Sequence, residues 1–144
     1  MMKEKLQADN ALLEKQIFWL SFSFDECSAI GLKDNYTPDE FGKFETLCSR
    51  YARGIDFLIR KIFRSIDAYE FENQGTLVDV INNAHKRGLI KDIEEIRLMK
   101  DIRNTIAHEY IEDALADTFE EVLTYSKILL ELSKNTKVYI EKII

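Results

Sequence analysis

Apolar residues recur along most of the chain at the spacing that marks one face of an α-helix. In residues 2–30 the steps between them are seven, four, three, four and three, through Leu6, Leu13, Ile17, Leu20, Phe24 and Cys27. Leu12, Trp19 and Phe22 widen this apolar face beyond a single stripe. The added width indicates either a second burial partner, such as another subunit, or one broad contact with the core. The pattern leaves both alternatives open.

The run Thr37-Pro38-Asp39-Glu40 predicts the start of a second helix, which should extend to about Ile66. Threonine can cap a helix, proline fits the first helical position, and glutamate three residues after the cap completes a capping box. The apolar positions of this helix form its expected core face: Phe44, Leu47, Cys48, Tyr51, Ile55, Leu58, Ile62 and Ile66.

Three further helices follow. Thr76, with Asp79 in the box position, should begin a short third helix that Gly88 closes. Asp92 should begin a fourth helix. Asp113 is expected to cap a fifth helix from about residue 114 to the C-terminus, with a bend or interruption at residues 133–136. No segment alternates as a strand does, so the sequence predicts an all-α, up-and-down bundle of about five helices.

Composition narrows the class of protein. The 144 residues should form one domain, residues 1–144. Cys27 and Cys48 lack metal-ligand spacing, which favours a reduced, cytoplasmic setting over a disulfide framework. The polar N-terminus does not resemble a signal peptide, and no apolar run approaches the roughly 20 residues of a membrane helix. No metal or cofactor is expected, since His108-Glu109 lacks the second histidine of a zinc-protease motif.

The net charge of -6 gives no reason to expect nucleic-acid binding by the chain as a whole, so any such surface must be local. The second helix carries five cations within an arc of about 100° if the helix is regular. They are Arg50, Arg53, Arg60, Lys61 and Arg64. This basic stripe is a weak candidate for RNA binding. The alternative is an ordinary solvated helix face.

Most of the candidate chemistry lies in residues 97–110, which contain Arg103, Asn104, His108 and Tyr110. Arginine presents a planar fork of donors that suits phosphate, and histidine exchanges protons near neutral pH. Each residue also has a plainer interpretation, such as a helix-end histidine or a packing tyrosine. For the arginine, the plainer interpretation is an ion pair with a nearby acid: Asp101, Glu109 or Glu112. His85, beside a helix end, receives no catalytic role.

Helical geometry separates two of these residues. Five residues rotate an ideal helix by about 140°, so Arg103 and His108 cannot share a face of one regular helix. Arg103 and Tyr110, seven residues apart, nearly can. The helix is therefore expected to end or distort near Ala107, or a second subunit must complete the site.

The segment from Arg103 to Tyr110 resembles the Arg-x4-His-x-Tyr motif of HepT-type toxins in the HEPN superfamily. The runs at residues 75–79 and 88–90, and the motif's place near the end of the fourth helix, resemble that branch as well. The resemblance implies a homodimer whose two motifs face each other, acting as a metal-independent endoribonuclease. Arg103 would bind the scissile phosphate, Asn104 would orient the site, and His108 would transfer protons.

The resemblance also implies a regulatory partner. Tyr110 would accept AMP from a cognate minimal nucleotidyltransferase, the MntA-type antitoxin of a type VII HEPN/MNT pair, and the added charge would block RNA. Two alternatives remain: a substrate-binding partner subunit of such a nucleotidyltransferase that does not cleave RNA, and a plain helical interaction module. The dimer face also stays open, with the wide apolar face of the first helix as one candidate.

Overall fold

A computed structural model describes residues 2–72, 75–111 and 113–144. Most of this part of the chain is helical and it contains no strand, which confirms the predicted all-α class. In chain order the segments are α1 (Met2–Ile30), α2 (Pro38–Phe57), η1 (Leu58–Ile62), α3 (Phe63–Tyr69), α4 (Leu77–Lys86), α5 (Ile93–Ile111), η2 (Leu115–Thr118) and α6 (Phe119–Ile143).

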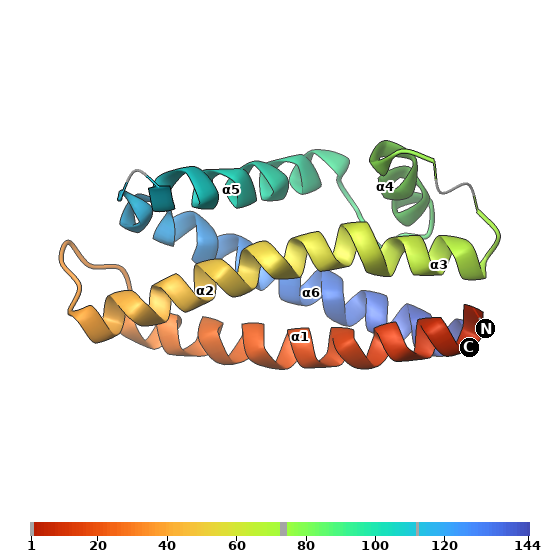
Figure 1. The fold of residues 1–144 in the computed structure, drawn as a ribbon, viewed down its shortest axis with the longest axis horizontal. Helices are drawn as coiled ribbons and strands as arrows, with labels where there is room; N and C mark the ends of the chain where they lie inside the picture. The colour runs from red at the N-terminus through yellow and green to blue at the C-terminus, as the bar shows by residue number, and fades with distance from the viewer. Residues whose placement is uncertain (1, 73–74, 112) are drawn as a thin grey trace.

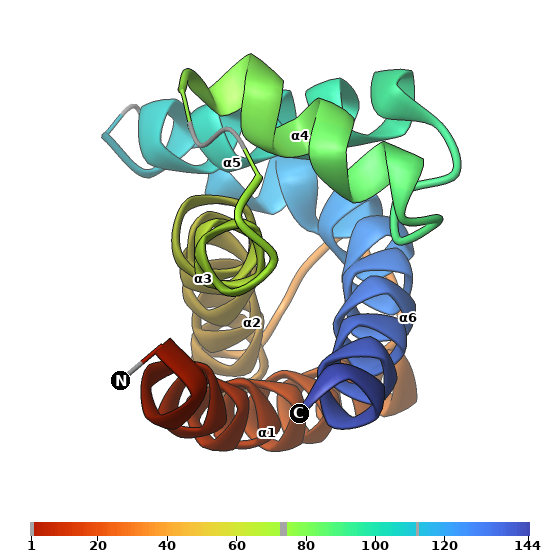
Figure 2. The same cartoon turned by 90° about the vertical axis from the view of Figure 1, so that its right-hand side faces the viewer.

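Long helices surround the core as a bundle (Figure 1). Seen along the bundle, α1 forms one side, the rod made by α2 and α3 forms the second, and α6 the third (Figure 2). The fourth side is made by α5 together with the short α4 (Figure 2). Both termini lie at one end of the bundle, and the C-terminal half of α5 lies toward the other (Figure 1).

The caps predicted from sequence are present. The Thr37 hydroxyl accepts a hydrogen bond from the Glu40 backbone N–H at 3.2 Å, and the Glu40 carboxylate accepts one from the Thr37 N–H at 2.9 Å. Thr76 and Asp79 form the same reciprocal pair at the start of α4. Gly88 follows α4 with φ +79°, a left-handed conformation that glycine adopts at little cost. These boundaries are set by residues within a few positions of each other.

The second predicted helix is continuous but not regular. Between α2 and α3 the chain forms a π-turn, η1, in which the Phe63 N–H donates to the Leu58 carbonyl five residues back. Leu58, Ile59 and Ile62 of this turn are buried, so the turn lies in the core. A π-turn accommodates one extra residue in a helix. It therefore rotates the residues that follow by about 100° relative to an uninterrupted α-helix.

Two predictions about the last helix are wrong. Asp113 does not cap it, because this residue has φ +59° in the turn after α5, and a 3-10 segment separates it from α6 at Phe119. Residues 133–136 do not interrupt α6 either. Ser133 and Thr136 are buried, and the Thr136 hydroxyl donates to the Leu132 carbonyl at 2.8 Å. That bond satisfies the hydroxyl inside the helix.

The core confirms the main stripe of α1. Leu6, Leu13, Leu20 and Cys27 are buried, and the bundle's largest fully buried side chains include Tyr51, Phe44 and Phe63. The additional apolar residues of α1 behave differently, because Leu12, Trp19 and Phe22 are 42%, 49% and 49% exposed. The alternative in which the whole face meets the core is therefore wrong for this chain.

A buried polar network holds α4 against the bundle. The Arg87 guanidinium donates to Asp67 at 2.6 Å and to Glu70 at 2.7 Å. The hydroxyl of Tyr139 from α6 donates to Glu70 at 2.7 Å, and the Asn83 amide donates to Asp67 at 3.2 Å. Burial alone lowers the pKa of Arg87, but the hydrogen bonds and charges of Asp67 and Glu70 outweigh it and raise that pKa. The network joins α3, α4 and α6.

The two buried thiols give a pH-dependent prediction. Burial raises the pKa of Cys27 to about 11 and that of Cys48 to about 12. Unfolded thiols ionise near about pH 8.5, so above that pH the unfolded state releases protons that the folded state keeps. Stability from this source is complete below about pH 8.5 and is lost as pH rises toward the folded pKa values. We expect urea unfolding to show a loss of ~1 kcal/mol per thiol and pH unit above about pH 9.

The matched variant for the thiol prediction is Cys48→Ala, compared with the wild type by its pH slope rather than its absolute stability. The variant should lose less free energy of unfolding than the wild type between about pH 8 and about pH 10.5. An equal slope in the two proteins would show that the Cys48 thiol does not contribute.

None of the helices in the described ranges combines the length and apolarity needed to cross a membrane.

Candidate functional site

The segment that carries the candidate chemistry lies on α5, and a buried hydrogen bond fixes its position. The Tyr51 hydroxyl of α2 donates to the Met99 carbonyl of α5 at 2.9 Å. Ile102 and Ile106, on the same side of α5, are buried in the core. The side of α5 that meets α2 is therefore set by packing, and the remaining side chains of the segment are held relative to α2.

Among the acids near it in sequence that the structure describes, Arg103 pairs with neither Asp101 nor Glu109. Its Nε and Nη2 lie 2.9 Å from one oxygen of Asp56 on α2, and its Nη1 donates to the Asn104 side-chain oxygen at 3.4 Å. Asp101 and Glu109 are therefore wrong as partners, and Glu112 lies outside the described residues. The arginine side chain remains 42% exposed, so it meets solvent while Asp56 fixes its orientation.

A hollow of about 650 Å³ lies between α2 and α5. Arg103, Ala107 and Tyr110 line it from α5, and Arg53 and Glu45 are among the residues that line it from α2. Tyr110 is 66% exposed, so its hydroxyl is open to modification or to a ligand. The seven-residue spacing thus brings Arg103 and Tyr110 to one hollow, as helical geometry predicts.

His108 and Asn104 lie on another side of the same helix. Both are exposed, and neither lines the hollow. They are four residues apart and so share one face of α5. A site built from all four residues of the motif must therefore extend around the edge of α5.

The expectation that the helix ends or distorts near Ala107 is wrong, because α5 continues to Ile111. Arg103 and His108 consequently remain about 140° apart around one regular helix. Within a single chain they do not converge on one atom. A second copy that presents its own α5 is the alternative that stays open.

The five cations of the second helix do not form one uniform stripe. Arg60 lies 3.9 Å from Asp56, and Lys61 lies 3.9 Å from the buried Asp9 of α1. Arg64 is half-buried beyond the π-turn. Arg50 and Arg53, by contrast, line hollows on the surface of α2. The basic surface is therefore concentrated at its N-terminal pair.

His85 has a structural role that sequence alone did not show. Its Nδ1 donates to the Ile90 carbonyl at 2.7 Å and so ties the end of α4 to the loop before α5. Within the described ranges, no group of three His, Cys, Asp or Glu side chains is arranged to hold a metal ion.

Asp56 is the site residue that sequence reasoning missed. It lies 47 positions before Arg103, on a different helix. A weak signal was available, because Asp56 is the one acid among the basic residues 50–64 of the second helix.

Comparison of the chain with models of protein families gives no match, and comparisons with curated proteins and with solved structures give none either. A functional assignment therefore depends on the motif and on the geometry around it.

Proposed function

We propose that this chain is a HepT-like toxin of a type VII HEPN/MNT pair, a cytoplasmic endoribonuclease that needs no metal ion. The segment from Arg103 to Tyr110 resembles the motif of that family, and one observation supports a chemical role for it. Arg103 is oriented by Asp56 at the edge of an open hollow that Tyr110 and Arg53 also line. An arginine held in this way is suited to bind a phosphodiester.

The proposed reaction uses the ribose of the substrate as its nucleophile. The 2′-oxygen forms a bond to the adjacent phosphorus as the bond from phosphorus to the 5′-oxygen breaks, which leaves a cyclic phosphate and a 5′-hydroxyl. Arg103 stabilises the negative charge that develops on the phosphate oxygens. Asn104, whose side-chain oxygen accepts a hydrogen bond from Arg103, helps to orient the guanidinium.

This reaction requires a base to take the 2′-proton and an acid to protonate the departing 5′-oxygen. Each chain offers one exposed histidine on α5, His108, while His85 is bonded to a backbone carbonyl. Two copies facing each other through α5 would supply both groups. In such a homodimer the Arg103 of one copy would also lie near the His108 of the other, which one regular helix cannot achieve.

Tyr110 is the proposed point of control. Its oxygen would form a bond to the α-phosphorus of ATP, with loss of its proton and release of pyrophosphate, in a reaction catalysed by the cognate nucleotidyltransferase. The added phosphate and adenosine would occupy the hollow beside Arg103. Negative charge there would compete with the RNA phosphate for the guanidinium.

A second candidate function is a non-catalytic partner subunit of a minimal nucleotidyltransferase. Two observations favour it: the net charge of -6, and the ion pair with Asp56 that already occupies Arg103. In that case the hollow between α2 and α5 would hold a nucleotide or part of the partner enzyme. A plain helical interaction module is the remaining alternative, without such an observation in its favour.

The deciding experiment incubates the purified chain with cellular RNA and with a defined oligoribonucleotide in the presence of a chelator. We expect cleavage of the RNA, and no cleavage of the oligonucleotide once a 2′-deoxyribose replaces the ribose at the cut position. Intact RNA throughout would contradict the nuclease proposal and favour the partner subunit. Cleavage of the 2′-deoxy substrate would contradict the proposed nucleophile.

A further inference from the structure

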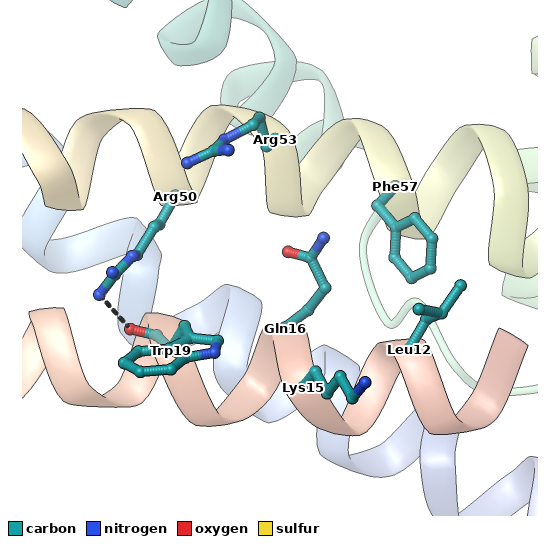
Figure 3. Close-up of a pocket in the computed structure, with 7 residues that line it drawn as sticks. All are labelled: Leu12, Lys15, Gln16, Trp19, Arg50, Arg53 and Phe57. Atoms are coloured by element: carbon teal, nitrogen blue, oxygen red, sulfur yellow. Dashed lines mark hydrogen bonds between the residues drawn. The ribbon is translucent and has the colours of Figure 1, made fainter.

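A second hollow, of about 350 Å³, lies on the other side of α2, between α1 and α2 (Figure 3). Lys15, Arg50 and Arg53 line it, and no aspartate or glutamate is among its lining residues. Three cations without a carboxylate form an unusual group in a chain of net charge -6. Lys15 and Arg53 also have no ion pair within the described ranges, in contrast to Arg103. The hollow is therefore suited to an anion.

Trp19 is held in an ordered position at this hollow. The Arg50 guanidinium lies 5.0 Å from its ring centre, and Arg50 also donates to the Trp19 carbonyl at 3.2 Å and to the Ser23 hydroxyl at 2.7 Å. The rings of Phe18 and Phe22 meet the indole edge-to-face, with ring centres 5.0 and 6.1 Å from its ring centre. The indole nevertheless stays about half exposed. Phe18 and Phe22, both exposed, thus hold the indole in place and leave part of its surface open to solvent.

The remaining lining residues suit a planar, polar ligand. Phe57 projects from α2 above Leu12, and the Gln16 side chain lies between Trp19 and Phe57 (Figure 3). The Gln16 amide has no hydrogen-bond partner in the part of the chain that the structure describes. An amide offers both a donor and an acceptor, as the edge of a nucleobase requires. Aromatic rings offer the stacking surface that every base can use.

One residue connects the two hollows. Arg53 lines the hollow with Arg103 and Tyr110 and also the hollow with Trp19 and Phe57. Its own hydrogen bond, to the Ser49 carbonyl at 3.4 Å, stays within α2. A nucleic-acid strand bound at Arg103 can therefore continue across α2 and pass over the Arg53 guanidinium.

We propose that the hollow between α1 and α2 binds a flanking nucleotide of single-stranded RNA whose scissile phosphate lies at Arg103. Its base stacks on Trp19 and meets the Gln16 amide, Phe57 lines the far end of the hollow, and the nucleotide's backbone phosphate contacts the cations of the hollow. This inference rests on the proposed function, since it places the RNA across both hollows. It adds a binding site for unpaired RNA at a distance from the reacting atoms.

The fluorescence of Trp19 gives a direct test, because this is the only tryptophan in the chain. The protein is used as the His108→Ala variant, so that the RNA stays intact, and is titrated with a single-stranded adenosine oligoribonucleotide. We expect saturable quenching of the tryptophan emission, since stacked bases quench indole. Inorganic polyphosphate, which has charge but no bases, should bind without comparable quenching.

A second measurement follows binding of a labelled form of the same oligonucleotide. Trp19→Ala should weaken binding by about 5-fold to 150-fold, the range that corresponds to loss of one stacked base. Arg53→Gln should weaken binding and reduce the dependence of affinity on salt. Lys134→Gln, an exposed cation of α6 away from both hollows, is the matched control and should leave binding unchanged.

The outcomes separate this inference from the proposed function. Quenching without RNA cleavage by the wild type would keep the nucleotide site and overturn the nuclease. Cleavage without quenching, with Trp19→Ala binding as tightly as the wild type, would overturn the nucleotide site alone. A dimer that dissociates in Trp19→Ala, with Trp19 emission that depends on protein concentration and not on RNA, would overturn it in favour of a protein interface.

Discussion

Replacement of His108 by alanine is expected to lower the rate of RNA cleavage by about 10²-fold to 10⁴-fold, the contribution typical of a positioned acid or base. The side chain is exposed, so its loss should leave the packing of the bundle intact. Helicity and the oligomeric state should therefore be unchanged. The measurement is the initial rate of cleavage of a defined oligoribonucleotide, with circular dichroism and sedimentation as checks on the fold.

His85→Ala is the matched control for this prediction. It removes the other histidine of the chain, which donates to the Ile90 carbonyl at the end of α4 and does not lie on α5. This variant should cleave RNA at the wild-type rate at a temperature where it is folded. Undiminished cleavage by His108→Ala would remove His108 from the mechanism, and equal losses in both variants would indicate a structural cause.

The largest effect on stability is expected from Asp67→Ala. Asp67 is fully buried and accepts hydrogen bonds from Arg87 and from Asn83. Its removal leaves the buried guanidinium with Glu70 as its remaining carboxylate. Breaking a buried pair in this way costs about 3–5 kcal/mol, because one charge stays buried without its partner. Urea unfolding should show this loss in the free energy of unfolding.

Arg97→Ala provides the comparison. Arg97 and Glu94 form an ion pair at 2.9 Å on α5, but both side chains are exposed. Exposed pairs of this kind are worth about 0–1 kcal/mol, so the variant should unfold close to the wild type. A loss below ~1 kcal/mol for Asp67→Ala would mean that Glu70 alone compensates Arg87, and that α4 is held mainly by its apolar contacts.

Features encoded by neighbouring residues could be predicted from the sequence. The capping boxes at Thr37 and Thr76 each depend on two side chains three positions apart, and both are present. The bounds of α1 and the glycine after α4 follow in the same way from local spacing and backbone conformation. In these cases the residues that set a helix end lie within about one helical turn of that end.

Features that depend on distant residues could not be predicted. Asp56 meets Arg103 only because α2 and α5 pack together, and acids closer in sequence were the natural candidates. The π-turn has no local sequence signal, since Leu58–Ile62 continues the apolar spacing of an ordinary α-helix. The predicted start of α6 is wrong because Asp113 has the residue type of a helix cap but adopts a left-handed conformation after α5.

The candidate site falls between these two cases. Spacing alone predicts that Arg103 and Tyr110 share a side of the helix, and both line one hollow. Spacing also separates His108 from Arg103, and α5 keeps that separation because it stays regular to Ile111. The helical pattern of one chain shows which side chains share a face, but it does not show what binds to that face. It therefore cannot predict whether a second copy brings a His108 close to Arg103.

The π-turn at Leu58–Ile62 has a consequence for how this chain tolerates insertions and deletions. It divides one rod into a half that carries Asp56 and a half that carries Ser65 and Asp67. Loss of a single residue from the turn would restore a regular α-helix and rotate one half against the other by about 100°. Ser65 would turn away from Asp9 and Asp67 from Arg87, or else Asp56 would turn away from Arg103. The turn therefore sets the rotational phase between the part of the rod that anchors the bundle and the part that orients the arginine.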